Sequence, residues 1–327
     1  MFIKDPGSIL VVQLAGMGDM VIAIPALLAL KKLYPCVAIR VLTNTRAKEI
    51  LNGINEVDEI FVCDTIKDFL VLMPILRAQR FGMAINLYRI YSFIGALKMF
   101  ALFIAIGARY WVGRDTNGRG FFYHLKVRET LPDELHEVEH KLNCIRALGS
   151  DVRIPEFKVV CKREDEDYIS SLLRREGLME GDLLVGINCA TFDPGRNWPV
   201  QAYALLAERL SSISGCRVAF SARTTDRQLF RNIKDHLKVD VIDLVGSLSV
   251  GQLIAFIKRC SVFVSPDSGP MHIAAALKIP LVALFADGEY SELRPFGRQE
   301  HMRIIRGPVK SIKADEVFSY VEELASR

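Results

Sequence analysis

The sequence lacks a hydrophobic run long enough to cross a lipid bilayer. A membrane-spanning helix needs about 20 consecutive apolar residues, whereas the longest apolar stretch, residues 93–107, is interrupted by Lys98. The first residues include Lys4, Asp5 and Pro6 and do not have the pattern of a secretory signal peptide. We therefore expect neither a membrane-spanning nor a secreted protein.

Cysteine pairs with the spacing of metal or redox sites are also missing. The seven cysteines are odd in number and form no Cys-x-x-Cys pair. Several lie in apolar, strand-like segments, where cysteine packs as a small core residue. This usage indicates a reducing compartment, and we expect a cytoplasmic protein.

A large net charge is absent as well, since the sum is only +4, but the charge is unevenly distributed. Between Arg77 and Arg128, nine Lys or Arg residues stand against one acid, Asp115, with aromatic residues interleaved. This segment suits an anionic partner, such as an acidic sugar, a phosphorylated lipid or a membrane surface. A solvated basic face around a core helix is the alternative. No nucleic-acid-binding motif accompanies the segment, so we expect no nucleic acid partner.

The hydrophobic pattern predicts two α/β halves. A chain of 327 residues is longer than most single domains. Short Val/Ile/Leu runs alternate with helical patterns in both halves, as in parallel sheets covered by helices on both faces. The expected strands lie at 9–14, 37–43, 60–63 and 83–87, and then at 183–188, 217–221, 239–243, 262–265 and 281–285.

We therefore predict two Rossmann-like, doubly wound domains, at residues 1–175 and 176–327, whose strand carboxyl ends face a central cleft. The charged stretch 162–182 separates them. The closing helix, near 314–325, is a candidate to pack back on the first domain.

The first strand runs into a glycine-rich turn that ends at an acid. Gly16 and Gly18 allow a tight turn, and Asp19 falls at the start of the next helix. The third glycine of the dinucleotide fingerprint would stand at Val21, so a nicotinamide enzyme is disfavoured. Asp19 either caps the helix or takes a proton from a substrate hydroxyl.

Two loops of the second half have the chemistry of a phosphate site. After the strand at 262–265 come Asp267, Ser268 and Gly269, and Pro270 opens a helix whose amino terminus attracts anions. Thr191 and Arg196, a hydroxyl and a fixed cation, follow the strand at 183–188. Together they suit a diphosphate, which a guanidinium binds bidentately. An ordinary capped helix after a buried strand is the alternative for the first loop.

These motifs and their order resemble glycosyltransferase family 9, which includes the ADP-heptose:lipopolysaccharide heptosyltransferases. The matching segments are Gly18-Asp19 with Pro25, Trp198-Pro199 with a cation two residues before, and the run 267–272. The resemblance implies a GT-B fold of two Rossmann-like domains, with the acceptor bound mainly by the first half and the nucleotide-sugar by the second. It also implies transfer with inversion at the anomeric carbon, without a metal or another cofactor.

The resemblance assigns roles to individual residues. Asp19 becomes the general base. The diphosphate is held by Thr191, Arg196, Ser268 and Gly269, and the donor sugar by Asp267. On rough position alone, Asp226 meets the ribose, and His272 belongs to the donor side. The acceptor-side candidates are Gly16, Gly18, Arg89 and Arg119.

The chain departs from the family pattern at two places. Arg196 stands where lysine is usual, which keeps the charge and changes the geometry. The loop after the last expected strand, residues 285–290, differs from the usual Phe-Gly-Pro-Thr, which leaves the exact donor sugar open.

Two metal motifs offer other interpretations. Asp165-Glu166-Asp167 has the Asp-x-Asp pattern of metal-dependent transferases, but acids favour the first turn of a helix, and we interpret it that way. His136-Glu137-x-x-His140 matches the motif of zinc metallopeptidases. A helical wheel directs both histidines away from the apolar face and toward solvent, which disfavours a zinc site. A zinc peptidase, and a sugar-nucleotide-binding protein without turnover, remain the alternatives.

The sequence thus predicts a cytoplasmic glycosyltransferase, which we expect at the inner face of the inner membrane. Its expected partners are a nucleotide-sugar donor, with ADP-heptose favoured, and an anionic lipid-linked glycan acceptor that meets the basic segment 77–128. Peripheral membrane contact through residues 91–106 is one option, although the apolar pattern favours a buried helix there.

Overall fold

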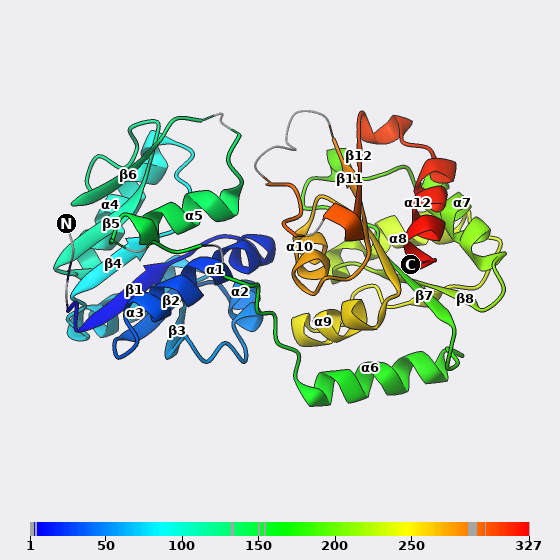
Figure 1. Ribbon diagram of the computed structural model, residues 1–327, viewed down its shortest axis with the longest axis horizontal. Helices are drawn as coiled ribbons and strands as arrows, with labels where there is room; N and C mark the ends of the chain where they lie inside the picture. The colour runs from blue at the N-terminus through cyan, green and yellow to red at the C-terminus, as the bar shows by residue number, and fades with distance from the viewer. Residues whose placement is uncertain are drawn as a thin grey trace. The chain divides into compact units, whose positions relative to one another are not determined.

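Figure 1 shows the computed structural model of the chain, which describes residues 3, 5–131, 134–149, 151–153, 155–286, 293–297 and 299–326. The chain divides into two compact units, Met1–Lys158 and Val159–Arg327. Each unit is built on a six-stranded sheet, and the paired strands run parallel throughout.

The first unit has the strand order β3-β2-β1-β4-β5-β6. Central β1 pairs with β2 on one side and β4 on the other, so that Leu10 lies opposite both Arg40 and Ala84. The strands are β1 (Ser8–Val12), β2 (Ala38–Thr43), β3 (Glu59–Val62), β4 (Met83–Asn86), β5 (Tyr110–Thr116) and β6 (Leu125–Glu129). The helices are α1 (Met17–Leu33), α2 (Thr45–Ile50), α3 (Ile66–Ala78), α4 (Phe93–Ile106) and α5 (Glu137–Arg146).

The second unit repeats this order as β12-β11-β10-β7-β8-β9, with β7 in the place of β1. The strands are β7 (Leu183–Asn188), β8 (Cys216–Ser221), β9 (Ile242–Asp243), β10 (Val262–Pro266), β11 (Leu281–Phe285) and β12 (Met302–Arg306). The α-helices are α6 (Arg163–Arg175), α7 (Val200–Ser211), α8 (Arg227–Lys234), α9 (Val250–Arg259), α10 (Gly269–Ala276) and α12 (Ala314–Ala325). Short 3-10 turns are η1 (Pro194–Arg196), η2 (Thr224–Asp226), η3 (Gln299–His301) and η4 (Val309–Ser311).

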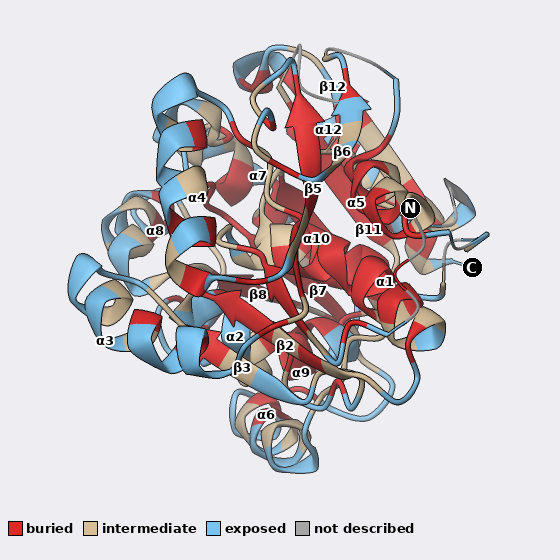
Figure 2. Ribbon diagram, turned by 90° about the vertical axis from the view of Figure 1, so that its left-hand side faces the viewer, coloured by how far each residue is buried: buried red, intermediate tan, exposed pale blue. Residues whose placement is uncertain are grey.

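Buried apolar side chains form a separate core in each unit. Figure 2 colours the ribbon red wherever a residue is buried. In the first unit, Leu10 and Val12 of β1 pack with Met99 and Phe103 of α4. In the second, the Trp198 ring is fully buried and its Nε1 donates to the Ile312 carbonyl at 2.9 Å. Trp198 therefore holds the start of α7 in the core.

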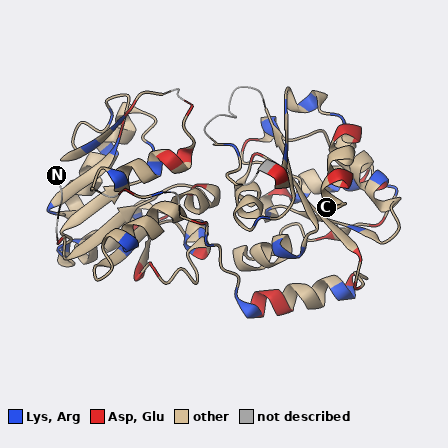
Figure 3. Cartoon of the chain, viewed as in Figure 1, with Lys and Arg blue, Asp and Glu red and all other residues tan. Residues whose placement is uncertain are grey.

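The division between the units falls after Lys158, earlier than the expected boundary at 175/176. The reason is that α6 packs against α9 of the second unit, with Lys258 Nζ 2.6 Å from Glu166. Figure 3 shows the acids at the beginning of α6 and the basic residues at its end. Asp165 and Glu166 of the Asp-x-Asp pattern lie in this first turn, as predicted, and Asp167 follows them on the same helix.

Three strands were not predicted, and one expectation about a helix needs correction. The strands β5, β6 and β12 were missed because charged residues interrupt their apolar pattern. The closing helix α12 packs on α7 and β11 of its own unit, with Val317 and Val321 in the second core, while its packing on the first unit stays a prediction. The helix expected to be buried, α4, buries one face and exposes the other.

Candidate active site

Both sheets contain a switch point, where the strand order reverses, between β1 and β4 in the first unit and between β7 and β10 in the second. Open parallel sheets bind ligands beyond the strand carboxyl ends at such a point. Asp19 follows β1 and Arg89 follows β4, while Arg196 follows β7 and Asp267 follows β10. We refer to these two groups as the Asp19 site and the Arg196 site.

Asp19 lies in the first turn of α1, three residues after the N-cap Gly16, and is partly buried. Burial raises the pKa of the Asp19 carboxyl above its usual value of 3.8, and the charge of Glu137 adds to this. The charges of Lys141 and Arg114 and a hydrogen bond from the Gly16 backbone pull the pKa down. A carboxylate with a raised pKa is a stronger base, as general base catalysis requires.

A cluster of buried charged residues lies close enough to Asp19 to shift its pKa. Arg114 on β5 is fully buried and donates from Nε to Glu129 at 3.0 Å and from Nη2 to Glu137 at 3.0 Å. Lys141 on α5 lies 3.0 Å from Glu137 and donates to the Leu87 carbonyl at 3.1 Å. Burial raises the pKa of both carboxyl groups, but the hydrogen bond with His140 and the charge of Arg114 lower the pKa of Glu129 to about 2. The charges of Lys141 and Arg114 hold the pKa of Glu137 below its usual range against the same effect of burial. Each buried charge is thus paired, as burial demands.

The same cluster corrects the prediction that His136 and His140 face solvent. Both are buried, because α5 packs against α1 on one side and against β5 and β6 on the other. The backbone amide of Val138 donates to His136 Nδ1 at 3.0 Å, so His136 caps α5. His140 Nδ1 lies 2.9 Å from Glu129.

These contacts disfavour the zinc peptidase alternative, because His136 and His140 are engaged within the fold. Glu137, the expected general base of that motif, is occupied by Arg114 and Lys141. Among the residues that the structure describes, no group of three or more His, Cys, Asp or Glu side chains is arranged to hold a metal ion.

The loop after β4 brings Arg89 to the Asp19 site. The Arg89 guanidinium lies over the Tyr91 ring, 5.1 Å from its centroid. Burial raises the pKa of the Tyr88 hydroxyl, and the charge of Asp19 contributes to the shift. Burial, and to a lesser extent the charge of Asp19, also raises the pKa of the Tyr91 hydroxyl to about 12. Tyr88 and Tyr91 therefore lie close enough to Asp19 to respond to its charge, and Arg89 lies beside Tyr91.

The other predicted acceptor-side residues are Gly16, Gly18 and Arg119. Gly16 has φ −66° and extended backbone, and Gly18 lies inside α1, so neither makes a left-handed turn. Arg119 lies in the turn after β5, one strand further from β1 than β4. The roles of Gly16, Gly18 and Arg119 in acceptor binding stay predictions.

In the second unit, the predicted cation and acid come together. Arg196 Nη1 donates to Asp267 Oδ2 at 3.5 Å, and Arg196 Nε lies 3.5 Å from Asp193. The Arg196 side chain is about one-third exposed (35%) and that of Asp267 much less (15%). The guanidinium is therefore fixed beside the β10 loop while part of it stays accessible to a ligand.

The amino terminus of α10 lies beside this pair. Ser268 is the N-cap residue and Gly269 is the first residue of the helix. The Ser268 hydroxyl does not cap the helix but bonds to Ser265 Oγ at 2.9 Å and accepts from Asn188 Nδ2 at 3.1 Å. The helix dipole and backbone amides at this end attract anions. His272 lies one turn further along and is buried.

Thr191 and Asp226 join the Arg196 site through Arg223, which the sequence analysis missed. Arg223 donates from Nε to Asp226 at 2.7 Å and from Nη2 to the Thr191 carbonyl at 2.9 Å. The Thr191 amide donates to Asn197 Oδ1 at 2.8 Å, and its hydroxyl donates to the Asp193 carbonyl. The Thr191 hydroxyl is therefore engaged within its own loop. Its contact with a diphosphate, like that of Asp226 with a ribose, stays a prediction.

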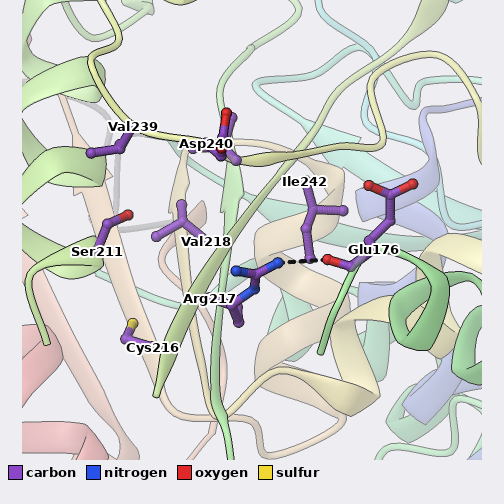
Figure 4. A pocket seen from close by; sticks show the side chains of 9 residues that line it. Glu176, Ser211, Cys216, Arg217, Val218, Val239, Asp240 and Ile242 are labelled. Atoms are coloured by element: carbon purple, nitrogen blue, oxygen red, sulfur yellow. Dashed lines mark hydrogen bonds between the residues drawn. The ribbon is translucent and has the colours of Figure 1, made fainter. Parts of the chain in front are cut away.

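A cavity in the second unit and part of one predicted donor loop are not included in the Arg196 site. A cavity of about 280 Å³ opens near Cys216 and Arg217 at the start of β8 (Figure 4), where Arg217 donates to the Glu176 carbonyl at 2.6 Å. It lies at the opposite end of β8 from the switch point, so we do not assign it to the site. In the loop expected to contact the donor sugar, residues 287–290 lie outside the described residues.

A family model and curated proteins are similar to this chain in sequence. A model described as glycosyltransferase family 9 (heptosyltransferase) matches residues 72–319. Lipooligosaccharide heptosyltransferase 2 of Haemophilus influenzae is 31% identical over 141 residues, 41% of this chain and 40% of that protein. The chain thus spans 40% of the length of the first curated relatives that it matches.

Solved structures share the fold over nearly the whole chain. The family 9 glycosyltransferase from Veillonella parvula has a TM-score of 0.86 at 20% identity, covering 99% of this chain and 98% of that one. The Escherichia coli ADP-heptose lipopolysaccharide heptosyltransferase II has a TM-score of 0.81 at 22% identity, covering 98% of both chains. The predicted GT-B fold of two Rossmann-like sheets is confirmed.

Proposed function

Because the chain belongs to glycosyltransferase family 9 (heptosyltransferase), we propose that it transfers a sugar from a nucleotide-sugar to an envelope glycan. Heptose from ADP-heptose is the favoured donor, and the lipopolysaccharide core is the favoured acceptor. A similar fold in a protein named ADP-heptose lipopolysaccharide heptosyltransferase supports this choice. The observation that carries the proposal is the pair of switch points, one with a carboxylate and one with a fixed cation beside a helix amino terminus.

Asp19 acts as the general base in this proposal. The acceptor hydroxyl oxygen forms a bond to the anomeric carbon, and its proton passes to the Asp19 carboxylate. Attack from the face opposite the leaving group inverts the configuration at that carbon. The raised pKa of Asp19 favours proton acceptance, and the paired charges of Lys141 and Glu137 keep the carboxylate in a fixed electrostatic environment.

The Arg196 site stabilises the leaving group. As the bond between the anomeric carbon and the diphosphate oxygen breaks, negative charge grows on the departing nucleoside diphosphate. Arg196 and the backbone amides at the start of α10 are fixed before the reaction begins, which is the condition for strong electrostatic stabilisation. These groups supply the charge that a metal ion supplies in metal-dependent transferases, so we propose metal-independent transfer.

We place the acceptor on the side of Tyr88, Arg89 and Tyr91. A cation next to aromatic rings suits an acidic glycan, because a guanidinium pairs with carboxylate or phosphate while rings pack on sugar faces. Such an acceptor, carried by a lipid, would place the enzyme at the inner face of the inner membrane. Among the described residues, the structure contains no helix with the length and apolarity of a membrane span.

Donor identity is tested by thermal stabilisation with a panel of nucleotide-sugars that includes ADP-heptose, ADP-glucose and UDP-glucose. A ligand at about 100 times its Kd stabilises the folded state by about 2.7 kcal/mol. The stabilising donor is then incubated with truncated lipopolysaccharide core, with and without EDTA, and release of ADP is measured. We expect ADP release in both samples and an inverted product linkage by NMR. Stabilisation without ADP release would indicate a binding protein, and no stabilisation by any donor would contradict the proposal.

A further inference from the structure

The outward faces of α3 and α4 are apolar, which the transfer reaction does not explain. Eight of the fifteen exposed large apolar side chains among the described residues lie on these two helices. They are between 45% and 80% exposed: Ile66, Leu70, Val71 and Ile75 on α3, and Phe93, Ile94, Leu97 and Ile104 on α4. In Figure 2 the outward sides of both helices are pale blue, as exposed residues are drawn. We call this surface the α3–α4 face.

Packing of the core does not require these residues to be apolar. The helices pack against each other, and their inner sides already supply the core with Met73 and Leu76 from α3 and Met99 and Phe103 from α4. A surface helix in a water-soluble protein normally has a polar outer face. Eight exposed apolar side chains on two helices that pack together are typical of an interaction site.

A basic cavity adjoins the α3–α4 face at the end of α3. It has a volume of about 690 Å³ and is lined by Pro74, Arg77, Ala78, Arg80, Phe81, Gly107 and Arg109. Three arginines and no acid line it. Arg77 is held in place because its Nη1 donates to the Ile104 carbonyl at 3.3 Å, and the Arg109 guanidinium lies 5.2 Å from the Tyr110 ring centroid. The cavity therefore suits a phosphate-bearing group.

We propose that the α3–α4 face docks on an anionic lipid bilayer. The apolar side chains enter the boundary between headgroups and acyl chains, and Arg77, Arg80 and Arg109 meet lipid phosphates, the arrangement of interfacial amphipathic helices. Charge favours this occupant over a second copy of the chain. In a symmetric dimer the same patch meets itself, which brings two sets of arginines together, whereas an anionic membrane neutralises them.

The test measures flotation of the full chain with vesicles of phosphatidylcholine, with or without phosphatidylglycerol. We expect binding to the anionic vesicles that weakens as salt rises, because salt screens the arginines. Each basic residue near a membrane contributes about 1 kcal/mol, so Arg80→Glu with Arg109→Glu should weaken binding at least about 30-fold. Ile94→Glu with Leu97→Glu should also abolish binding, because it places charge in the apolar boundary.

Matched controls separate docking from folding and from transfer. Met179→Glu and Arg174→Glu change exposed residues of the second unit and should bind vesicles like the unchanged protein. The docking variants should keep their melting temperature and their stabilisation by nucleotide-sugar, so failure of docking is distinct from failure of the proposed transfer. Absence of binding to anionic vesicles, or equal binding by all variants, would overturn the proposal. A dimer that the docking variants dissociate, without an effect on vesicle binding, would also overturn it and assign the face to a second copy.

Discussion

At the switch point of the first sheet stands a carboxylate, Asp19, while the same point of the second sheet holds a cation, Arg196, and the start of α10. The strand order is identical in the two units. Topology therefore places a candidate ligand site at the same point of each sheet, and the residues that follow the strands at that point differ in their chemistry.

The two units also differ in how far the charged residues near their switch points are buried. The first unit pairs its charges inside the fold, where Arg114, Glu129, Glu137 and Lys141 are all buried. The second leaves Arg196 partly accessible between Asp193 and Asp267. A buried, fully paired cluster fixes a neighbouring group in place, whereas an accessible cation is available to a ligand. We interpret the first arrangement as one that holds Asp19 in place as a base. We interpret the second as one that leaves Arg196 available to bind a nucleotide-sugar.

The largest expected effect comes from removal of the carboxylate. General base catalysis contributes about 10²–10⁴-fold to a rate, so Asp19→Asn should lower kcat by roughly 10³-fold, or about 4 kcal/mol. ADP release with a saturating donor and acceptor measures it. The exposed acid Glu59 on β3 provides a control, because Glu59→Gln should leave kcat unchanged. A kcat for Asp19→Asn within threefold of the unchanged protein would remove Asp19 from the mechanism.

The second effect concerns stability and contrasts the two units. Glu137→Ala removes the carboxylate that pairs with Lys141 and leaves Arg114 with Glu129 alone, and breaking such a buried pair should cost about 3–5 kcal/mol. Glu166→Ala breaks the exposed pair with Lys258 in the second unit and should cost about 1 kcal/mol or less. Urea denaturation gives both values. Equal losses would show that the buried cluster has no special role.

Charge pairing in the cluster also predicts how stability depends on pH. The pKa of Glu129 and Glu137 lies below the usual 4.5 in the folded protein. Their contribution to the free energy of unfolding is therefore present above pH 4.5 and lost as the pH falls through the folded values, about 2 for Glu129.

The contribution of Asp19 to stability has the opposite sign, since its raised pKa means that ionisation of this carboxyl costs stability at neutral pH. Asp19→Asn should thus melt at a higher temperature than the unchanged protein at pH 7, and calorimetry that shows a lower temperature would contradict this.

The third effect is on donor affinity. Arg196→Ala removes a charge-assisted contact, which is worth about 2 kcal/mol, so the Kd for the donor should rise about 30-fold. Arg196→Lys keeps the charge and should recover part of the loss. Isothermal titration of each variant measures this. An unaltered Kd in Arg196→Ala would exclude Arg196 from the donor site.

The sequence predicted the central strands and the loops that follow them. The strands β1, β4, β7 and β10 are continuous apolar runs, buried on both faces, so their pattern is unambiguous. Because the ends of neighbouring parallel strands meet at one edge, Arg196 and Asp267 could be expected to lie together before the structure was known.

Residues whose charge is paired across distant segments could not be predicted in the same way. β5 contains Arg114, which looks exposed until Glu129 and Glu137 supply its partners from β6 and α5. The helical wheel misplaced His136 and His140 because it allows a helix one buried face, whereas α5 packs on both α1 and the sheet. Arg223 lies in no recognisable sequence motif, and only its contacts with Asp226 and Thr191 show that it belongs to the Arg196 site.

The division of labour between the two sites is tested most directly by calorimetric titration of the stabilising nucleotide-sugar into Asp19→Asn. We expect a Kd within about twofold of that of the unchanged protein, because a base on the acceptor side makes no contact that holds the donor. A loss of affinity as large as that of Arg196→Ala would contradict the account, since the carboxylate would then belong to the donor site.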